Sequence, residues 1–336
     1  MNGLFLQFAS NLGMRNNSDH LIRWSSTTKP ALGGVSFFIL FLLSIASYSI
    51  FFEENKLLYN PKFLGFLAAS VLGFLIGLAD DAYNTKPILK LGGQLACAVI
   101  LVISGNKIVF FGNEILDIGL TFFWIIGLMN SINMLDNMDG ITSTVSISII
   151  LSSLFILLWK NDLYNPDFIL LEGVLCALIG FLFYNWNPSK MYMGDTGSQF
   201  LGVFLAAIGI NYFWMGHEAQ GYRIQTKQFI EPLLIFMIPI IDTTIVTVNR
   251  LLRGQSPMVG GRDHTTHHLS YMGLTDRQVA LTFFGLSFIS FLGLMMIEFF
   301  FTDWGYTQLI VFFLYFLGLL GTMFYITKRY KQPTKK

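Results

Sequence analysis

Long stretches without a charged residue are the feature that most limits how this chain can fold. Such stretches of 20 residues or more occupy residues 33–52, 140–159, 196–216, 278–297 and 304–327. An α-helix needs about 20 apolar residues to cross a bilayer. Charged residues make up only 12% of the chain, whereas soluble domains carry about 25%. The sequence therefore predicts an all-α polytopic membrane protein.

Five shorter or interrupted apolar runs bring the expected number of transmembrane helices to ten: residues 63–79, 88–104, 119–135, 168–184 and 229–248. No internal repeat divides the 336 residues, so we expect a single integral membrane domain over residues 1–336. Between two of the runs, apolar residues alternate around "FGNE" from Gly105 to Gly119. This alternation predicts a small hairpin on the periplasmic side.

Charges divide unequally between the two sides of the membrane. With ten spans, the loops on one side carry 15 Lys and Arg residues and those on the other side carry 6. Cytoplasmic loops of membrane proteins are enriched in Lys and Arg, so the first side is predicted to be cytoplasmic. The same side holds nine of the 13 aspartates, whereas all seven glutamates lie toward the other side.

Three groups of Asp and Asn residues lie at the predicted inner ends of spans, in "GLADDAYNTKPILK", "NMLDNMDG" and "YNWNPSKMYMGDTGS". Solvation of helix ends would explain one such group, but not the preference for Asp with neighbouring amides in all three. An aspartate at the centre of a span costs about 2.5–3.5 kcal/mol on insertion scales, and less near the interface. Short carboxylates and amide oxygens are the ligands of hard cations such as Mg²⁺. The groups therefore predict a divalent cation site.

Helical spacing gives two further expectations. If a helix continues through "NMLDNMDG", then Asn133, Asp136 and Asn137 share one face. Asp80 and Asp81 are adjacent, and adjacent helical side chains point about 100° apart. We therefore expect only one carboxylate of this pair to face the reacting atoms.

A basic segment, "RLLRGQSPMVGGRDHTTHHL", follows the run at residues 229–248. His264 and His268 are four residues apart and could bind zinc on a helix, but no HExxH motif is present and Gly260 and Gly261 favour a loop. Histidines add little to the positive charge that sets membrane topology, so topology does not account for the three histidines of this segment. A basic, glycine-containing loop beside carboxylate groups suits an anionic ligand that binds with a divalent cation.

Taken in order, six short segments resemble those of a known family: "KPALGG", "LADD" with Lys90 downstream, "NMLDNMDG", "FYNWNPSKMYMGDTGS", "PIIDTTIVTVNRLLRGQSP" and "HTTHHL". The family is that of the polyprenyl-phosphate N-acetylhexosamine-1-phosphate transferases, which includes the phospho-N-acetylmuramoyl-pentapeptide transferase of peptidoglycan synthesis. The segments extend from Lys29 to Leu269, about three quarters of the chain. Their order and common membrane side make the combination specific.

The resemblance implies a reaction in which a UDP-sugar gives its sugar 1-phosphate to undecaprenyl phosphate, releases UMP and starts a lipid-linked glycan. The glycan would belong to the cell envelope, as in cell-wall or lipopolysaccharide O-antigen synthesis. It also implies a multi-pass protein of the bacterial inner membrane with a cytoplasmic active site. The implied partners are the UDP-sugar, the polyprenyl phosphate and membrane lipids, with no nucleic acid and with a homodimer left open.

Residue roles follow by motif position. Asn133 and Asp195 would be ligands of Mg²⁺, with Mn²⁺ as an alternative, and Asp80 and Asp81 match the pair proposed to activate the lipid phosphate. The predicted substrate-binding residues are Lys90, Asp136, Asn137, Asp139, Asn185, Arg262, His264, His267 and His268.

Two departures from the family pattern matter. The family usually has His-x-His-His or three successive histidines where this chain has "HTTHH". This favours the N-acetylglucosamine-1-phosphate branch and leaves the individual histidine roles open. The family also has a complete helix before the loop ending in "GG", whereas "MNGLFLQFASNLGMR" is too short to span. We therefore expect the first family helix to be incomplete here.

Two other classes fit less well. "DNMDG" contains the D-x-x-D-G that opens the CDP-alcohol phosphotransferase motif, but Ile141 and Thr142 replace the Ala-Arg that follows there. An ion-coupled transporter would place acids near mid-membrane and contain repeats. Asp242 suits that alternative best, but the other acids cluster at inner ends.

Overall fold

The computed structural model describes residues 1–11, 29–52, 57–216, 223–257, 260–301 and 304–332. Within these ranges the secondary structure is helical and contains no strand. The helices are α1 (Asn2–Asn11), α2 (Gly33–Phe51), the short 3-10 turn η2 (Leu57–Tyr59), α3 (Pro61–Tyr83), α4 (Pro87–Ile103), α5 (Glu114–Leu135), α6 (Ile141–Trp159), α7 (Pro166–Asn185), α8 (Gly194–Gly209, continued by a π-helical turn at Ile210–Trp214), α9 (Gln225–Ile235), α10 (Met237–Leu252), α11 (Thr265–Tyr271), α12 (Asp276–Phe300) and α13 (Tyr306–Arg329).

Three of the long helices begin after an asparagine whose side chain satisfies free backbone N–H groups. The side chains of Asn60, Asn113 and Asn165 accept hydrogen bonds from the first turns of α3, α5 and α7. Asparagine is among the best N-cap residues. Pro61 and Pro166 follow two of these caps, at the first helical position where proline loses no hydrogen bond.

The predicted spans correspond to these helices. Among the described residues, eight helices are long and apolar enough to cross a membrane, α9 with α10 passes the same test as one broken span, and α4 is a shorter apolar helix. Each of the ten apolar runs in the sequence coincides with one of these elements. The chain is therefore an all-α polytopic membrane protein, as predicted.

The break between α9 and α10 bends this span by 75°. Pro239 is the third residue of α10. A proline ring clashes with the carbonyl four residues earlier in a continuous helix, which here would be that of Ile235, the last residue of α9. Pro239 thus accounts for the break after α9.

The predicted hairpin between Gly105 and Gly119 is wrong. Asp117 Oδ1 accepts hydrogen bonds from the N–H of Phe110 at 2.9 Å and from the N–H of Phe111 at 2.7 Å. These N–H groups therefore bond to a side chain and not to a second strand. The segment is a loop that ends at Glu114, where α5 begins.

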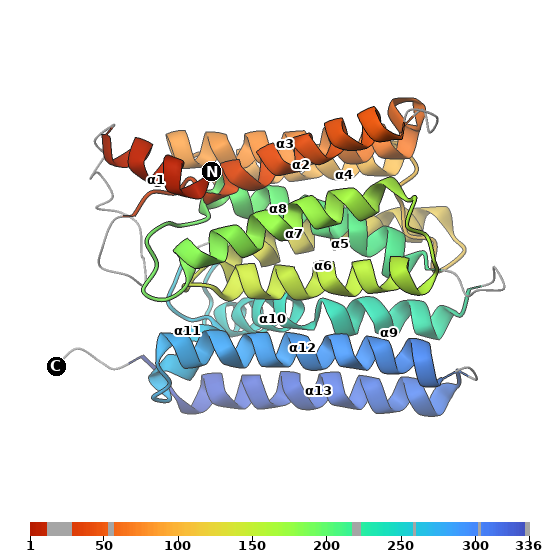
Figure 1. Cartoon of the computed structure of the whole chain (residues 1–336). Helices are drawn as coiled ribbons and strands as arrows, with labels where there is room; N and C mark the ends of the chain where they lie inside the picture. The colour runs from red at the N-terminus through yellow and green to blue at the C-terminus, as the bar shows by residue number, and fades with distance from the viewer. Residues whose placement is uncertain (12–28, 53–56, 217–222, 258–259, 302–303, 333–336) are drawn as a thin grey trace.

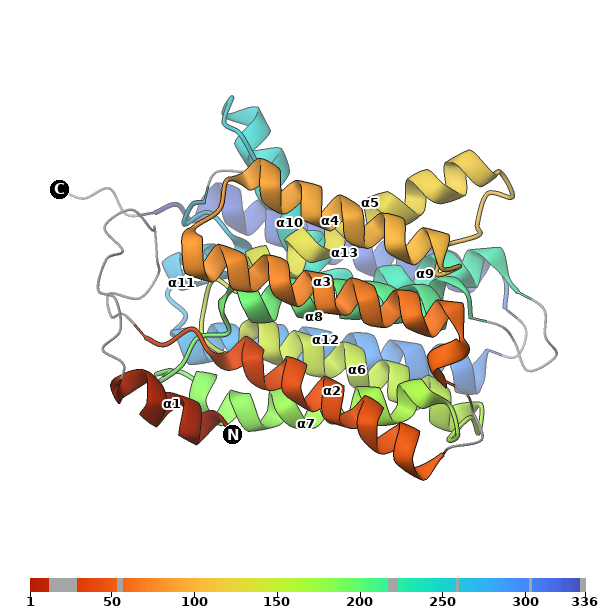
Figure 2. The same ribbon diagram turned by 90° about the horizontal axis from the view of Figure 1, so that it is seen from above.

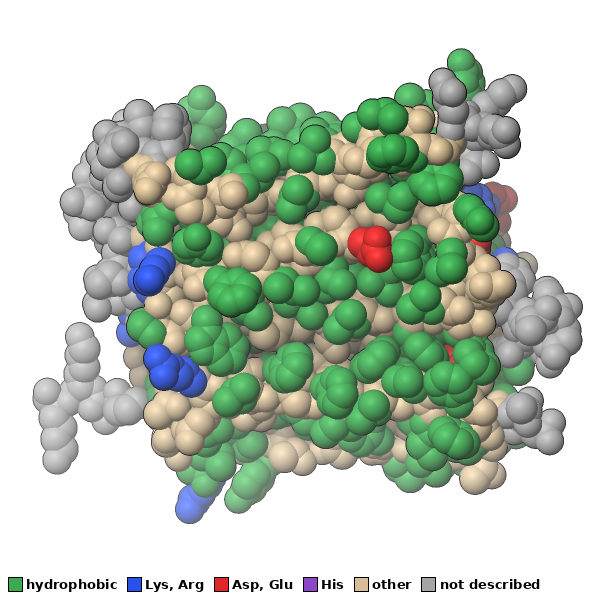
Figure 3. Space-filling view, viewed as in Figure 1, with side chains coloured by type: hydrophobic (Ala, Val, Ile, Leu, Met, Phe, Trp, Pro, Cys, Tyr) green, Lys and Arg blue, Asp and Glu red, His purple; other side chains and the backbone are tan. Residues whose placement is uncertain are grey.

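The long helices lie side by side and run between two ends of the molecule (Figures 1 and 2). Helix α8 is at the centre, where it packs against α2, α3 and α5. Every residue of α8 from Thr196 to Gly209 is buried. On the face shown in Figure 3, hydrophobic side chains cover the middle, and Lys and Arg side chains gather at the left end. Helix α8 carries the polar residues Asp195 and Thr196 in its first turn, so its N-terminal end places polar groups inside an apolar bundle.

Candidate active site

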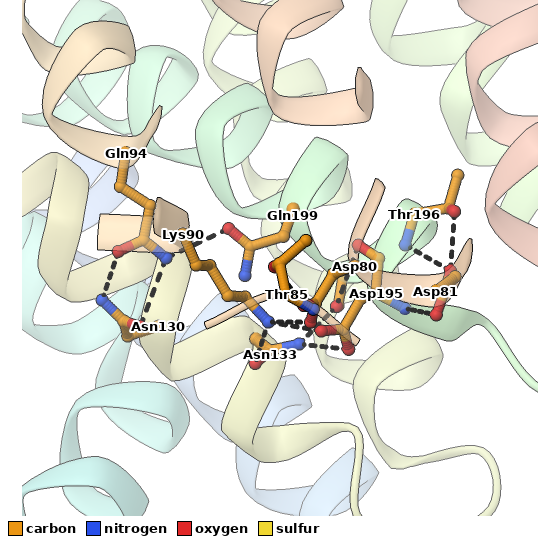
Figure 4. Close-up of polar contacts among 11 residues, drawn as sticks. Asp80, Asp81, Thr85, Lys90, Gln94, Asn130, Asn133, Asp195, Thr196 and Gln199 are labelled. Atoms are coloured by element: carbon orange, nitrogen blue, oxygen red, sulfur yellow. Dashed lines mark hydrogen bonds and ion pairs between the residues drawn. The ribbon is translucent and has the colours of Figure 1, made fainter. Parts of the chain in front are cut away.

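Four helices bring charged and amide side chains together around one ammonium group (Figure 4). Lys90 Nζ of α4 lies 3.1 Å from Asp80 Oδ2 of α3 and 3.2 Å from Asn133 Oδ1 of α5. It also donates to Asp195 Oδ2 of α8. We call Asp80, Asn133 and Asp195 the oxygen cage. The structure thus brings together both predicted metal ligands, one predicted catalytic aspartate and the predicted lysine.

Hydrogen bonds fix the orientation of the cage. Asn133 Nδ2 donates to Asp195 Oδ1 at 2.9 Å and to Ser198 Oγ at 2.8 Å, which leaves its carbonyl oxygen turned toward Lys90. Asp80 Oδ1 accepts from the backbone N–H and the hydroxyl of Thr85. Each side chain of the cage is therefore held by a second group, so hydrogen bonds within the protein keep the three oxygens close together.

Asp81 points elsewhere, to the start of α8. Its Oδ1 accepts from the N–H of Asp195 at 2.9 Å, and its Oδ2 accepts from the N–H and hydroxyl of Thr196 at 2.8 and 2.6 Å. The first N–H groups of a helix have no partner within the helix, and a carboxylate is favourable there. The side chains of the two adjacent aspartates diverge, as their spacing predicts. Asp81 binds the backbone of Asp195 and so fixes the position from which the Asp195 side chain extends.

Two glycines permit this close approach of α3 and α8. A Cβ on Gly77 would lie 2.1 Å from the carbonyl oxygen of Asp195. Gly194 has a φ of +73°, and a Cβ there would lie 2.6 Å from Asp81 Oδ2. A left-handed backbone conformation suits glycine because it lacks a Cβ. In "MGDTGS", Gly194 is therefore required by the turn into α8, and Asp195 supplies the carboxylate of the cage.

Helix α5 ends at Leu135, so the predicted shared face of Asn133, Asp136 and Asn137 does not form. Asn137 Nδ2 donates to the carbonyl of Met134 at 2.8 Å, which a continuing helix would have bonded to its own backbone. Asp136 lies just beyond the helix and is partly buried. Burial and the charges of Asp195 and Asp81 raise the pKa of Asp136 to about 7.

Asp139 and Asn185 connect two loops at this end of the bundle. Asp139 accepts from the N–H of Ser189 at 3.0 Å, from its hydroxyl at 2.7 Å and from Asn187 Nδ2 at 3.1 Å. Asn185 Oδ1 accepts from the N–H of Gly140 at 3.0 Å. These contacts give both residues a bracing role beside the site, and their predicted contact with substrate stays a prediction.

The histidine segment is part helix and part loop. His264 precedes α11, whereas His267 and His268 lie in it, and all three are buried. His264 Nδ1 lies 2.8 Å from Asp242 Oδ2, and His268 Nδ1 contacts the carbonyl of Tyr330. The backbone N–H of His264 donates to His267 Nδ1 at 3.3 Å, so contacts within the chain hold all three histidines.

His267 is uncharged at neutral pH. Burial, with the charge of His264 adding to it, lowers the pKa of His267 to about 3. Next to it, Thr266 Oγ1 donates to Asn137 Oδ1 at 2.6 Å, so α11 contacts the loop that follows Asn133. Arg262, the remaining predicted ligand, is exposed.

Arg250 and Arg253 of the basic segment have a structural role. Arg250 Nη2 lies 2.6 Å from Asp263 Oδ1, and Arg253 also pairs with Asp263. Burial alone would raise the pKa of Asp263, but the hydrogen bonds and charge of Arg250 lower this pKa to about 2. Asp263 therefore stays ionised and holds the basic segment next to His264.

An amide layer formed by Gln94, Asn130 and Gln199 was missed by the sequence analysis. Gln94 Nε2 donates to Asn130 Oδ1 at 3.2 Å and to Gln199 Oε1 at 3.1 Å, and Asn130 Nδ2 donates back to Gln94 Oε1 at 2.9 Å. Each amide lies one helical turn from a residue at the cage, four positions after Lys90 and Asp195 and three before Asn133. An amide at this spacing inside an apolar run is the signal that could have revealed the layer.

We expect the amide layer to position the cage. Polar contacts between membrane helices contribute about 0.6–2 kcal/mol each, and replacing a single amide leaves its partners unsatisfied. Replacing all three with leucine (Gln94→Leu, Asn130→Leu, Gln199→Leu) should preserve the melting temperature in detergent. Turnover should fall by about tenfold, which corresponds to 1.4 kcal/mol of transition-state stabilisation.

The matched control is Ser153→Ala, because buried Ser153 of α6 donates only within its own helix, to the carbonyl of Ile149. Turnover of the triple variant equal to that of the wild type would show that the layer has no positioning role.

Comparison with known proteins adds a family to this geometry. Residues 63–213 match the family model described as glycosyl transferase family 4. A probable undecaprenyl-phosphate N-acetylglucosaminyl 1-phosphate transferase of Bacillus subtilis (strain 168) is 28% identical over 272 residues, which cover 77% of this chain and 71% of that protein. The matched residues 63–213 include the whole oxygen cage and Lys90.

Two further relatives carry related names. A decaprenyl-phosphate N-acetylglucosaminephosphotransferase of Mycolicibacterium smegmatis is 25% identical over 281 residues, or 75% of this chain and 68% of that protein. A phospho-N-acetylmuramoyl-pentapeptide-transferase of Enterococcus faecalis is 30% identical over 208 residues, or 56% of this chain and 63% of that protein.

Proposed function

Because the chain belongs to glycosyl transferase family 4, we propose that it transfers N-acetylglucosamine 1-phosphate from a UDP-sugar to undecaprenyl phosphate and releases UMP. The product would start a lipid-linked glycan of the cell envelope. The observation that carries the proposal is the oxygen cage at the polar end of an apolar bundle. The name of the Bacillus subtilis relative and the absence of a triple histidine support this sugar over the muramoyl-pentapeptide.

The cage fits a divalent cation such as Mg²⁺ or Mn²⁺. Two carboxylates and one amide oxygen already converge on a cation, the ammonium of Lys90. In the described part of the chain, no three His, Cys, Asp or Glu side chains could hold a metal together. Mg²⁺ usually binds through one or two carboxylates plus substrate phosphates. Asp195 and Asn133 would hold the cation, which when bound would offset the repulsion between the two phosphate groups.

The chain's own residues position the reactants. Phosphoryl transfer depends mainly on positioning and on neutralisation of charge. A phosphate monoester has a second pKa of about 6 and is mostly dianionic at pH 7, so an oxygen of the lipid phosphate can attack the β-phosphorus directly. The bond from that phosphorus to the bridging oxygen breaks, and UMP leaves with the electron pair. Asp80 would orient the attacking group and Lys90 would bind phosphate oxygens, while Asp81 keeps Asp195 in place.

We place the active site on the cytoplasmic face of a bacterial inner membrane. The cage lies at the inner ends of α3 and α5, on the side that carries 15 of the 21 Lys and Arg residues. Excess Lys and Arg marks cytoplasmic loops. A cytoplasmic site would give the UDP-sugar direct access, while the polyprenyl chain would stay in the bilayer.

An ion-coupled transporter is the less favoured alternative. Asp242 was the acid that suited it best, but the side chain is buried and engaged by His264 and by the N–H and hydroxyl of Thr265, the last two at 2.8 and 2.6 Å. These contacts anchor the start of α11 and leave no carboxylate oxygen free for a transported ion.

A transfer assay with a panel of labelled UDP-sugars tests the proposed function. The purified protein, Mg²⁺ and undecaprenyl phosphate should move label from UDP-N-acetylglucosamine into a lipid fraction, in preference to UDP-N-acetylmuramoyl-pentapeptide. Absence of a lipid product from every sugar of the panel would contradict the proposal.

Substitution of His267 should affect the sugar donor more than the lipid. The buried neutral side chain lies in α11, and α11 touches the loop after Asn133 through Thr266. We expect His267→Ala to raise the KM for the UDP-sugar about tenfold, a loss of 1.4 kcal/mol of binding, and to leave the KM for the lipid nearly unchanged. Steady-state kinetics with each substrate varied in turn measure this, and a change confined to the lipid KM would contradict it.

A further inference from the structure

The ammonium of Lys90 occupies the position that a metal ion bound by the cage would need. We infer that Lys90 is a placeholder: in the substrate-free protein it closes the oxygen cage and competes with the divalent cation for the same oxygens. The divalent cation therefore binds tightly only together with the diphosphate of the donor. The inference rests on the proposed function, since that function supplies the cation.

The contacts of Lys90 leave it no spare donor. An ammonium group has three N–H donors, and Lys90 Nζ has three oxygen partners, one each from Asp80, Asn133 and Asp195. A lysine that holds the cage in this way cannot also bind a phosphate oxygen. Lys90 must release the cage before it can contact an anionic substrate.

Charge makes the two cations mutually exclusive. The cage contains two carboxylates and Lys90 contributes one positive charge, so the closed cage retains one negative charge. A divalent cation on the same oxygens would lie at contact distance from the ammonium, and like charges at such distances repel strongly where water is scarce. The side chain of Lys90 is only 16% exposed, so solvent screens this repulsion poorly.

An incoming diphosphate would change this balance. Its oxygens give the released ammonium new acceptors and complete the coordination of a cation that the cage alone supplies with few ligands. Cation binding and donor binding should consequently favour each other, with Lys90 as the residue that couples them.

Manganese binding to the purified full chain without substrate tests the inference. Loss of the free-Mn²⁺ signal in electron paramagnetic resonance measures the Kd. Lys90→Met should bind Mn²⁺ at least tenfold more tightly than the wild type, and addition of UDP should tighten Mn²⁺ binding strongly in the wild type but little in the variant. Equal or weaker Mn²⁺ binding by Lys90→Met would overturn the inference.

A matched control is available four residues earlier, at the residue that precedes α4. Lys86 is exposed at the start of α4, so Lys86→Met removes the same charge from the same end without opening the cage. Its Mn²⁺ affinity should stay within about twofold of the wild type, because a surface charge acts through screening solvent. An equal gain in both variants would mean that net charge, and not the placeholder, sets the affinity.

Two further measurements distinguish a failure of the inference from instability of the Lys90→Met variant. Lys90→Gln, which keeps a polar side chain, should repeat the gain in Mn²⁺ affinity if Lys90→Met proves unstable. Asp195→Asn should remove tight binding in both lysine backgrounds, and persistence of that binding would place the cation outside the cage and overturn the inference. The transfer assay reports separately on the proposed function, because absence of a lipid product contradicts that function whatever the Mn²⁺ affinities are.

Discussion

Asp195→Asn is expected to lower the rate of transfer by about a thousandfold or more with the fold retained. Asparagine keeps the size of the side chain but removes a charge that lies in the cage with Asn133 and Lys90. A thousandfold loss equals about 4 kcal/mol of transition-state stabilisation, which is the scale of removing a charged group aimed at the reacting atoms. Turnover with saturating Mg²⁺ and the melting temperature in detergent are the quantities to measure.

Removal of the divalent cation should reproduce this loss. Wild-type protein in excess EDTA should fall to the level of Asp195→Asn, and Mg²⁺ or Mn²⁺ should restore it. The control substitution is Asp162→Asn, an exposed aspartate in the loop between α6 and α7, at the other end of the bundle, which should leave turnover unchanged. Full activity in excess EDTA would rule out the cation in this account.

Substitutions of the two adjacent aspartates, Asp80 and Asp81, should affect stability and turnover differently. Asp81→Asn places an amide where two backbone N–H groups and one hydroxyl need an acceptor, and an unsatisfied buried polar group costs about 1–3 kcal/mol. The variant should lose both stability and activity. Asp80→Asn keeps the start of α8 intact and loses only its pairing with Lys90. We expect it to lose turnover by about a hundredfold, or 2.7 kcal/mol, with little change in melting temperature.

Thr196→Val provides the control for the stabilising role of Asp81. It removes one of the three hydrogen bonds to that carboxylate and keeps the two from the backbone. It should lower the melting temperature by part of the amount seen for Asp81→Asn and leave most of the turnover. If Asp81→Asn were as stable as the wild type while Asp80→Asn unfolded, the assignment of the two aspartates would be reversed.

The cage and the helices could be predicted because their signals are local in the sequence. The uncharged runs predicted the spans, and the divergence of Asp80 and Asp81 followed from the 100° between adjacent helical residues. The residues of the cage came from short motifs, although no spacing rule alone joins Lys90 to Asp195, which lies 105 positions further along the chain.

The features that the sequence did not predict involve hydrogen bonds between side chains and the backbone, which hydrophobic patterns do not indicate. The alternating pattern near "FGNE" predicted a hairpin, but the carboxylate of Asp117 binds the N–H groups that a second strand would have bound. The end of α5 depends on the amide of Asn137. The partner of His268 is the carbonyl of Tyr330, 62 residues away at the end of α13, a pairing that no local pattern indicates.

The fate of the β-phosphate of the donor tests the central claim most directly. The purified protein should be incubated with UDP-N-acetylglucosamine labelled with ³²P at the β-phosphate, undecaprenyl phosphate and Mg²⁺, in parallel with Asp195→Asn. Transfer of a sugar 1-phosphate predicts that the label enters the lipid fraction at the rate at which UMP appears, and that neither happens in the variant. Label that stays in UDP while the sugar moves to the lipid, or label that never leaves the nucleotide sugar, would contradict the account.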